Sequence, residues 1–402
     1  MLKGEIILKG DKSITHRAIM LAAITEGKTK IINPSNCIDV QSSIDVLNMC
    51  GSKMYYDGNV IINTSKIYKN PDNVLYCGNS GTTARLLIGL LFGQGISATI
   101  DGDKSLRKRP MNRVLKPLEL MNLKYTSNNS KLPVTIYSSD VKSMQYTMDV
   151  PSAQVKSSIL LASISCETHS DIVDNFNSRD HTERMLDYLN KKNKKLSEFT
   201  YNIPGDISNA SFLIAAAVCI KNSDIIIRNV LYNKTRFGFI DTLINMNADI
   251  TISNIKDVCN EQACDIRVKY NPDITSADIS SENIVSMIDE IPAYAVVSCF
   301  SKGHTSLVNA SELRIKESDR IASLCSHLLS GNVNIQESTD GFSIKPKNKL
   351  YNTIKIKSDD HRIIMASEIF NLIVSGDFSG NFTDKISISF PDFYNIIKRI
   401  IK

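Results

Sequence analysis

The sequence contains no tryptophan, and only 7% of its 402 residues are aromatic. The hydrophobic core must therefore rest on aliphatic side chains, since 42% of the residues are hydrophobic. No apolar run reaches the ~18 residues that a membrane-spanning helix needs, so we expect no such helix. The charged fraction of 22% is typical of globular proteins and excludes a disordered or collagen-like chain.

The cysteines and histidines also lack the spacing that zinc ligands have. The nine cysteines are scattered along the chain without a Cys-x-x-Cys pair, which is typical of reduced, mostly buried thiols in a cytoplasmic protein. The N-terminus lacks the apolar stretch of a secretion signal. A net charge of +5 is mild for this length: it does not indicate a nucleic-acid-binding protein, but it suits a small anionic ligand.

One pattern recurs six times along the chain: a helical run rich in small and aliphatic residues, a polar turn and a short β-branched strand. The helical runs begin near Thr15, Thr82, Val155, Asn209, Pro292 and His361. Each carries small residues on more than one face, which is typical of a helix buried on all sides. The pattern predicts an α/β protein of two lobes with three units each, rather than a single parallel sheet.

Polar residues precede several of these helices. Ser13 can cap the first helix, which would place Lys12 at a helix N-terminus, where backbone N–H groups already favour an anion. A solvated lysine before an ordinary cap is the alternative. Residues 77–85 form a glycine- and hydroxyl-rich turn that is not a Walker A loop, because no Gly-Lys-Ser/Thr follows.

A basic loop follows that turn. It holds four cations in six residues, Lys104, Arg107, Lys108 and Arg109. It is either a solvated loop or a phosphate clamp in which arginine binds two oxygens at once.

If residues 314–320 are helical, Lys316 and Arg320 share one face and need acids or an anionic ligand beside them. We predict that such helix N-termini, from both halves of the chain, converge on one anion-attracting cavity.

Together these motifs resemble the 5-enolpyruvylshikimate-3-phosphate (EPSP) synthase family, the 3-phosphoshikimate 1-carboxyvinyltransferases. The matching segments follow the family's order from about residue 4 to about residue 395: GDKSITHR, GNSGTTAR, KRPM, SAQVKS, SRDHTERM, IDEIP, RIKESDR and DDHR. The SAQ, SRDHTE and IDE variants resemble the bacterial subgroup often called class II.

The resemblance implies the fold and the reaction. The fold would be the two-lobed α/β enolpyruvyl transferase fold, an inside-out barrel with three βαβαββ repeats and buried parallel helices in each lobe. One lobe would hold residues 1–12 and 205–402 and the other residues 13–204, with a hinge near 12–13 and 204–206. The carboxyvinyl group of phosphoenolpyruvate would pass to the 5-hydroxyl of shikimate 3-phosphate through a tetrahedral intermediate, on the pathway to chorismate and the aromatic amino acids.

This reaction needs no metal or organic cofactor. The expected partners are the two substrates, without nucleic acid or membrane, and the expected form is a cytoplasmic monomer. The resemblance assigns residues by position. The catalytic residues would be Asp289, Glu317 and Lys12. The shikimate 3-phosphate ligands would be Lys12, Ser13, Arg17, Ser152, Gln154, Ser178, Asp289 and Lys316. The phosphoenolpyruvate ligands would be Lys12, Asn79, Gly81, Arg109, Gln154, Arg320 and Arg362.

Some positions depart from the family's pattern. Ala153 replaces a phosphate-binding serine, and His181 replaces a tyrosine; we expect His181 to have a hydrogen-bonding or structural role. Ile388 stands where some members carry a lysine, which Lys385 could replace. Gly81 is retained, and because a larger residue there obstructs glyphosate in this family, we predict that glyphosate competes with phosphoenolpyruvate.

Three alternatives remain open. A UDP-N-acetylglucosamine enolpyruvyl transferase would have asparagine after its early lysine and a loop cysteine near residue 105, where this chain has Ser13 and Ser105. An RNA 3'-terminal phosphate cyclase would need a nucleophilic histidine, for which His361 is the candidate. A binding protein without catalysis is disfavoured because Lys12 and the two carboxylates are present.

Overall fold

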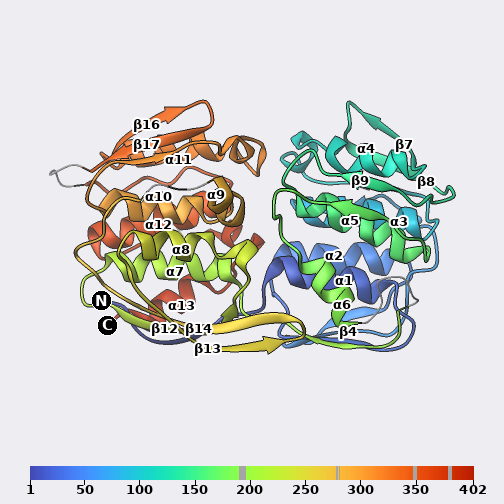
Figure 1. Cartoon of the computed structure of the whole chain (residues 1–402), viewed down its shortest axis with the longest axis horizontal. Helices are drawn as coiled ribbons and strands as arrows, with labels where there is room; N and C mark the ends of the chain where they lie inside the picture. The colour runs from blue at the N-terminus through green and yellow to red at the C-terminus, as the bar shows by residue number, and fades with distance from the viewer. Residues whose placement is uncertain (190–195, 278, 280, 347–350, 379–382) are drawn as a thin grey trace. The chain divides into compact units, whose positions relative to one another are not determined.

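The structure is a computed structural model that describes residues 1–189, 196–277, 279, 281–346, 351–378 and 383–402. Contacts divide the chain into two compact units, and Figure 1 shows their helices and strands. Unit 1 comprises Met1–Leu8, Gly205–Lys256 and Gln262–Lys402, and unit 2 comprises Lys9–Pro204 and Asp257–Glu261. A hinge near residues 12–13 and 204–206 stays a prediction.

Unit 2 alternates helices and short strands. Its helices are α1 (Lys12–Ala23), α2 (Ile38–Met49), α3 (Gly81–Gly93), η1 (Leu106–Lys108), α4 (Asn112–Leu120), α5 (Ala153–Ser165) and α6 (His181–Tyr188). Its strands are β2 (Thr29–Ile32), β3 (Met54–Tyr56), β4 (Val60–Asn63), β5 (Leu75–Tyr76), β6 (Ala98–Asp101), β7 (Lys124–Asn128), β8 (Lys131–Tyr137), β9 (Gln145–Thr147), β10 (Asp171–Val173) and β11 (Thr200–Asn202). They form sheets in the orders β11-β2-β4-β3, β5-β6-β8-β7 and β10-β9.

Unit 1 has the same alternation. Its helices are α7 (Ile207–Cys219), η2 (Lys234–Arg236), α8 (Gly238–Asn245), α9 (Ser281–Met287), α10 (Ile291–Phe300), η3 (Ser311–Ile315), α11 (Arg320–Ser330), α12 (His361–Ser375), η4 (Asp384–Ile388) and α13 (Phe393–Ile400). Its strands are β1 (Lys3–Ile7), β12 (Asp224–Leu231), β13 (Asp249–Val258), β14 (Glu261–Lys269), β15 (Thr305–Leu307), β16 (Asn334–Ser338) and β17 (Gly341–Lys345). They form sheets in the orders β1-β12-β14-β13 and β15-β17-β16.

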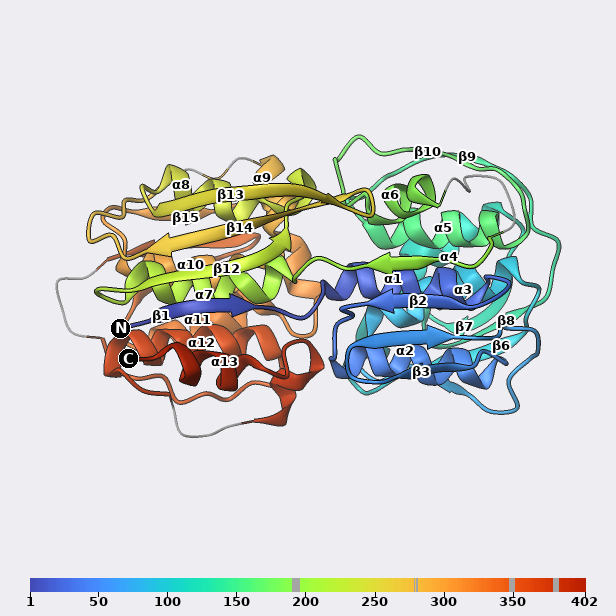
Figure 2. The same cartoon turned by 90° about the horizontal axis from the view of Figure 1, so that it is seen from below.

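The six predicted buried helices are confirmed. They are α1, α3 and α5 in unit 2 and α7, α10 and α12 in unit 1, and within each unit the three contact one another. Figure 2 shows the sheet of β1, β12, β14 and β13 lying over α7. That sheet turns Ile6, Ile225 and Ile227 inward, all fully buried. The helices repeat more regularly than the strands. Each unit has three buried helices, whereas the sheets contain between two and four strands in the described residues.

Small residues allow the buried helices to approach closely. An ideal Cβ on Gly89 of α3 would lie 2.2 Å from the carbonyl oxygen of Ser158 in α5. One on Gly93 would lie 2.4 Å from the carbonyl oxygen of Ala162. A larger residue at either position would push the two helices apart, so the small-residue content of the repeats has a packing cause.

Candidate functional site

The first candidate residues lie at the start of α1. Lys12 is the first residue of the helix, and its Nζ lies 2.8 Å from Oδ2 of Asp39 in α2. The predicted cap at Ser13 is wrong: Asp11 caps α1, since its Oδ1 accepts the backbone N–H three residues later at 3.0 Å. A carboxylate in this position also offsets the positive helix end. The hydroxyl of Ser13 instead lies 3.5 Å from a guanidinium nitrogen of Arg179.

The side chain of Arg17 connects residues near the N-termini of three helices. It is buried, with 3% of its surface exposed. Its Nε donates to Oγ1 of Thr182 in α6 at 3.0 Å, and its Nη1 donates to the carbonyl of Ser13 at 2.9 Å. The Thr182 hydroxyl lies 2.7 Å from that of Ser157 in α5. The first turns of α1, α5 and α6 are thereby joined around one guanidinium group.

Asn79, Gly81 and Arg109 come together at the start of α3. Arg109, with 6% of its surface exposed, donates from Nη2 to Oδ1 of Asn79 at 2.6 Å. An ideal Cβ on Gly81 would lie 3.0 Å from Nη1 of Arg85 and 3.3 Å from Nη1 of Arg109. Glycine therefore leaves room beside two guanidinium groups, an arrangement suited to an anion.

The basic loop has two kinds of cation. Arg109 is buried, whereas Lys104, Arg107 and Lys108 are exposed. Arg107 forms an ion pair with Asp101. The phosphate-clamp prediction therefore fits Arg109, and the solvated-loop alternative fits the other three residues.

Arg85 is a polar residue that the sequence-based assignment omitted. Its Nη1 donates to Oε1 of Gln154 in α5 at 2.8 Å, and Nε2 of Gln154 donates to Oγ1 of Thr82 at 3.0 Å. The predicted ligand Gln154 is thus oriented by two residues of α3. The available signal was the position of Arg85, one helical turn inside the glycine-rich turn.

Ser152 and Ser178 precede α5 and α6 and are both buried. The Ser178 hydroxyl donates to Oδ2 of Asp174 at 2.5 Å. Lys156, which the sequence analysis did not select, lies 2.9 Å from the same Asp174 oxygen and 2.8 Å from Oε1 of Glu183. Burial alone would lower the pKa of Lys156, but the charges and hydrogen bonds of Glu183 and Asp174 raise it above its usual value.

In unit 1 the candidates gather around Arg320, the first residue of α11, which is 1% exposed. Its Nη1 donates to Oδ1 of Asp289 at 3.3 Å. Its Nη2 donates to Oε2 of Glu317 at 2.5 Å, and its Nε donates to Oδ2 of Asp360 at 2.8 Å. Nη2 also donates to Oδ1 of Asp360 at 3.4 Å, so three carboxylates share the one guanidinium group. Asp360, the N-cap of α12, is a further member that the sequence-based assignment omitted.

Lys316 and Arg362 complete this cluster. Nζ of Lys316 lies 3.9 Å from Oδ1 of Asp289, and Nη1 of Arg362 donates to the Asp289 carbonyl at 2.8 Å. Lys316 and Arg320 do not share a helix face, because η3 ends at residue 315 and α11 begins only at Arg320, so the condition set for such a face is not met. Their common contact with Asp289, rather than helical spacing, brings the two cations together.

The cluster shifts the pKa values of its members. Burial alone would raise the pKa of the Asp360 carboxyl, but the charge and hydrogen bond of Arg320 bring it below its usual value. Desolvation lowers the pKa of the Lys316 ammonium even though 27% of its side chain is exposed, and Asp289 opposes this shift. Lys316 therefore loses its proton more readily than an ordinary lysine.

Comparisons with known proteins agree over the full length of the chain. A family model described as EPSP synthase (3-phosphoshikimate 1-carboxyvinyltransferase) matches residues 1–397. The chain belongs to the EPSP synthase family. The 3-phosphoshikimate 1-carboxyvinyltransferase of Persephonella marina is 36% identical over 421 residues, which cover 100% of this chain and 97% of that protein.

Other EPSP synthases support the same assignment. The 3-phosphoshikimate 1-carboxyvinyltransferase of Staphylococcus epidermidis is 38% identical over 415 residues, covering 99% of this chain and 96% of that protein. A solved EPSP synthase from Acinetobacter baumannii matches with a TM-score of 0.84 at 33% identity, covering 99% of this chain and 96% of that chain. The predicted fold class is therefore confirmed.

His181 is one of the positions where this chain departs from the family pattern. Its Nδ1 lies 2.6 Å from Oε1 of Glu261, and both side chains are fully buried. Glu261 belongs to the short segment Asp257–Glu261, which joins unit 2 from elsewhere in the sequence. The expected hydrogen-bonding role of His181 is thus confirmed, and the ring is turned into the protein core rather than toward solvent.

Lys385, considered above as a replacement for a missing lysine, lies on the surface. It forms an ion pair with Asp359, which directly precedes the α12 N-cap, and 48% of its side chain is exposed. Both residues line an open cavity of about 520 Å³ together with Lys357. Lys385 is therefore near the helix end that carries Arg362, as part of a solvent-facing ion pair.

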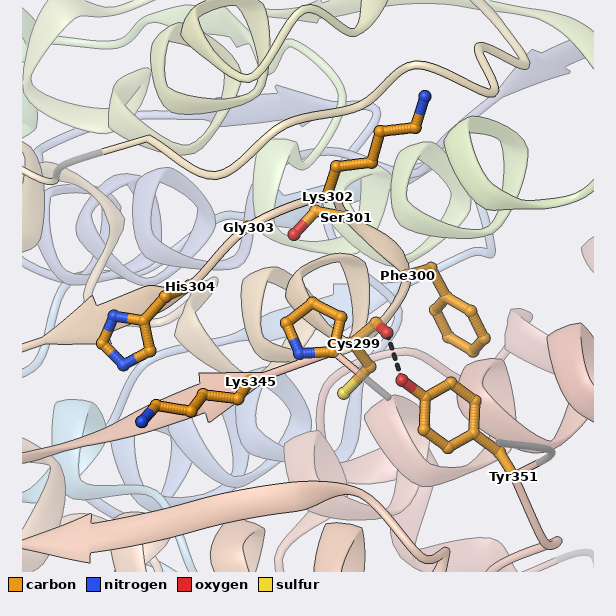
Figure 3. Close-up of a pocket in the computed structure, with 9 residues that line it drawn as sticks. Cys299, Phe300, Ser301, Lys302, Gly303, His304, Lys345 and Tyr351 are labelled. Carbon is orange, nitrogen blue, oxygen red and sulfur yellow. Dashed lines mark hydrogen bonds between the residues drawn. The ribbon is translucent and has the colours of Figure 1, made fainter. Parts of the chain in front are cut away.

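A second open cavity of unit 1, of about 630 Å³, lies elsewhere (Figure 3). It is lined by Lys302, His304, Lys345 and the end of α10, where the Tyr351 hydroxyl donates to the Cys299 carbonyl at 2.6 Å. Asp289 precedes the other end of α10, and a helix of this length rises about 15 Å. The cavity is therefore separate from the carboxylate cluster.

Two features are absent from the described residues. Among them, no three His, Cys, Asp or Glu side chains are grouped so that they could hold a metal ion. No helix in the described part of the chain combines the length and the apolar character required to cross a membrane.

Proposed function

We propose that this chain is a 3-phosphoshikimate 1-carboxyvinyltransferase, which transfers the carboxyvinyl group of phosphoenolpyruvate to the 5-hydroxyl of shikimate 3-phosphate and releases phosphate. The observation that carries the proposal is the family match over residues 1–397. It is supported by two polar clusters, one in each unit, that hold the expected cations and carboxylates. We also propose that the enzyme acts as a cytoplasmic monomer whose partners are its two substrates.

Unit 2 supplies groups suited to shikimate 3-phosphate. Lys12 and Arg17 offer positive charge at the start of α1, and Ser13 offers a hydroxyl beside them. Ser152 is the N-cap of α5, where backbone N–H groups favour a phosphate, and Ser178 lies two residues before the N-cap of α6. Gln154 lies in the first turn of α5 and its amide would complete the set.

Phosphoenolpyruvate would bind to the second group of cations. Asn79, Gly81 and Arg109 form its unit 2 contacts, together with Gln154 and Lys12, because Gly81 leaves space beside guanidinium groups. Arg320 and Arg362 form its unit 1 contacts. Arginine suits this role since its planar fork matches both a carboxylate and a phosphate.

Two carboxylates would carry the protons. Asp289 takes the proton of the 5-hydroxyl as its oxygen attacks C2 of phosphoenolpyruvate, and Glu317 protonates C3, giving a tetrahedral intermediate. The bond between C2 and the phosphate oxygen then breaks, and the phosphate leaves with the proton that Asp289 had taken. Glu317 removes a proton from the new methyl group, which restores the double bond. These steps use side chains alone, and Lys316 and Lys12 lie among the assigned ligands that would balance the changing charge.

Arg320 links the two carboxylates. It donates to both Asp289 and Glu317, and such contacts favour the ionised form of an acid.

The alternatives are less well supported. His361, the candidate nucleophile of a cyclase, is 1% exposed and so has little access to a nucleotide. Ser105 hydrogen-bonds to Arg109 at 3.3 Å where the UDP-N-acetylglucosamine enzymes would have cysteine. A binding protein would bind both substrates without releasing phosphate.

The test is phosphate release from phosphoenolpyruvate in the presence and absence of shikimate 3-phosphate. Release that depends on shikimate 3-phosphate is expected. UDP-N-acetylglucosamine serves as the matched alternative acceptor, and release with that compound alone would contradict the proposal. A parallel incubation with radiolabelled ATP tests for the covalent nucleotide adduct of a cyclase.

A further inference from the structure

A row of buried polar side chains runs through unit 2 from α1 to the start of α3. Nδ1 of His16 lies 2.9 Å from Oγ of Ser43 in α2, and that oxygen lies 2.7 Å from Oγ1 of Thr83. Oγ1 of Thr83 lies 2.7 Å from Oγ of Ser80. None of the four residues is more than 1% exposed. Water therefore cannot easily replace a member of the row if it is removed.

The row ends at the turn that carries Gly81. Ser80 is the N-cap of α3, and its Oγ accepts the backbone N–H of Thr83 at 3.1 Å. Gly81 follows directly, next to Arg85 and Arg109. Because Ser80 and Gly81 share a peptide bond, a shift of the cap would move the glycine relative to both guanidinium groups.

The middle of the row is connected to Lys12. Oγ1 of Thr83 lies 3.4 Å from the carbonyl oxygen of Asp39, and the carboxylate of Asp39 pairs with Lys12. Burial, followed by the positive charges of Lys12 and Arg17, lowers the pKa of His16 well below its usual value. The His16 ring is therefore neutral near pH 7 and anchors the row without adding a charge.

We propose that Ser80, Thr83, Ser43 and His16 are positioning residues for phosphoenolpyruvate, acting through the Gly81 turn. The proposal rests on the proposed function, which assigns phosphoenolpyruvate to this turn. None of the four side chains needs to touch the substrate. Shikimate 3-phosphate should be less affected, because Ser178 is held by Asp174 and Thr182 by Arg17, and neither contact involves a member of the row.

Two substitutions at Thr83 separate hydrogen bonding from packing. Thr83→Val keeps the shape and removes the hydroxyl, whereas Thr83→Ser keeps the hydroxyl and removes a methyl group. We expect Thr83→Val to raise KM for phosphoenolpyruvate about tenfold, the scale of one buried hydrogen bond, with kcat and KM for shikimate 3-phosphate within about threefold. Thr83→Ser should stay within about twofold of the parent in all three constants.

Thr25→Val is the matched control. Thr25 is also fully buried, and its hydroxyl donates to the Leu21 carbonyl at 2.7 Å within its own helix region, away from the row. This control should leave KM for phosphoenolpyruvate unchanged. Equal effects of Thr83→Val and Thr83→Ser, or equal effects of Thr83→Val on both substrates, would overturn the proposal.

Binding can be followed without turnover. The rise in melting temperature on adding phosphoenolpyruvate to enzyme saturated with shikimate 3-phosphate should be retained by Thr83→Ser and reduced in Thr83→Val. The melting temperature without ligand shows whether each variant is folded. A parent protein that binds both compounds in this assay but releases no phosphate would contradict the proposed function alone, whereas equal shifts for the two Thr83 variants would contradict the positioning role.

Discussion

The two candidate clusters hold their cations with different kinds of oxygen. In unit 2, Arg17 donates to the Thr182 hydroxyl, and Arg109 donates to the Asn79 amide. In unit 1, three carboxylates surround the single guanidinium group of Arg320. Neutral oxygens orient a cation without cancelling its charge, whereas carboxylates compensate that charge. The first arrangement suits the binding of an anion, and the second suits proton transfer between acids.

The largest effect is expected for a substitution of Glu317, which separates proton transfer from anion binding. Glu317→Gln removes a titrating group of unit 1 while keeping its size. Turnover should fall by about two decades or more, the usual scale for the loss of an acid–base group, and affinity for shikimate 3-phosphate should stay within about tenfold. Phosphate-release kinetics and calorimetric titration with shikimate 3-phosphate measure the two quantities. Near-normal turnover would remove Glu317 from the mechanism and with it the distinction between the clusters.

Lys12 is a predicted ligand of unit 2 that pairs with a carboxylate, so it tests the comparison from the other side. Lys12→Met should lower kcat and raise KM for both substrates, with kcat/KM reduced by about 100-fold, since a charged hydrogen bond to substrate is lost. Asp39→Asn, which keeps the lysine and weakens its pair, is the control and should retain most of the activity. A Lys12→Met variant with unchanged KM values would argue against a binding role.

Gly81→Ala tests the space beside the guanidinium groups of unit 2. Its Cβ would lie 3.0 Å from Arg85 Nη1 and 3.3 Å from Arg109 Nη1, so a neighbouring group must shift. We expect KM for phosphoenolpyruvate to rise about tenfold and the inhibition constant of glyphosate to rise further. Inhibition assays at several phosphoenolpyruvate concentrations measure both. If glyphosate at millimolar concentration does not compete in the parent enzyme, the prediction fails.

Lys156 concerns stability rather than activity. Its ammonium is paired with Asp174 and Glu183, and only 7% of its side chain is exposed. Lys156→Met leaves two carboxylates without this partner, so the free energy of unfolding should fall by about 3 kcal/mol. Urea denaturation measures the change, and Lys104→Met, at an exposed position of the same unit, is the control. A loss similar to that of the control would contradict the prediction.

The same pair predicts a pH dependence. Burial alone would raise the pKa of Asp174, but hydrogen bonds from Ser178 and Lys156 bring it below its usual value of 3.8. This carboxylate therefore contributes stability that is present above about pH 4 and is lost as the pH falls through its folded pKa. Lys156→Met should lose less stability than the parent protein between pH 5 and pH 3 in urea denaturation. Parallel curves for the two proteins would contradict this.

The smallest effect is expected at Lys385. Its ion pair with Asp359 faces solvent, and such pairs contribute little. Lys385→Met should change KM for phosphoenolpyruvate by less than about threefold. A much larger increase would show that Lys385 reaches the substrate and takes the place of the lysine that is absent at Ile388.

Much of the architecture could be predicted because local rules governed it. The six helical runs of small and aliphatic residues became the six buried helices, and Lys12 became the first residue of α1. The prediction failed where two nearby side chains could both cap the same helix. Asp11 rather than Ser13 caps α1, since both side chains accept a backbone N–H and the choice depends on chain direction at the turn. The spacing of Lys316 and Arg320 would have put them on one helix face, but residues 316–319 are not helical.

By itself, the sequence determined the family, the order of the motifs, the buried helices and the identity of the charged groups. The tertiary structure decided which partners those groups have: Asp39 for Lys12, Gln154 for Arg85, Asp360 for Arg320 and Glu261 for His181. Such pairs join residues from 27 to 80 positions apart. Periodicity and capping act over a few residues, whereas the charge that a buried cation retains depends on atoms that only folding brings within hydrogen-bonding distance.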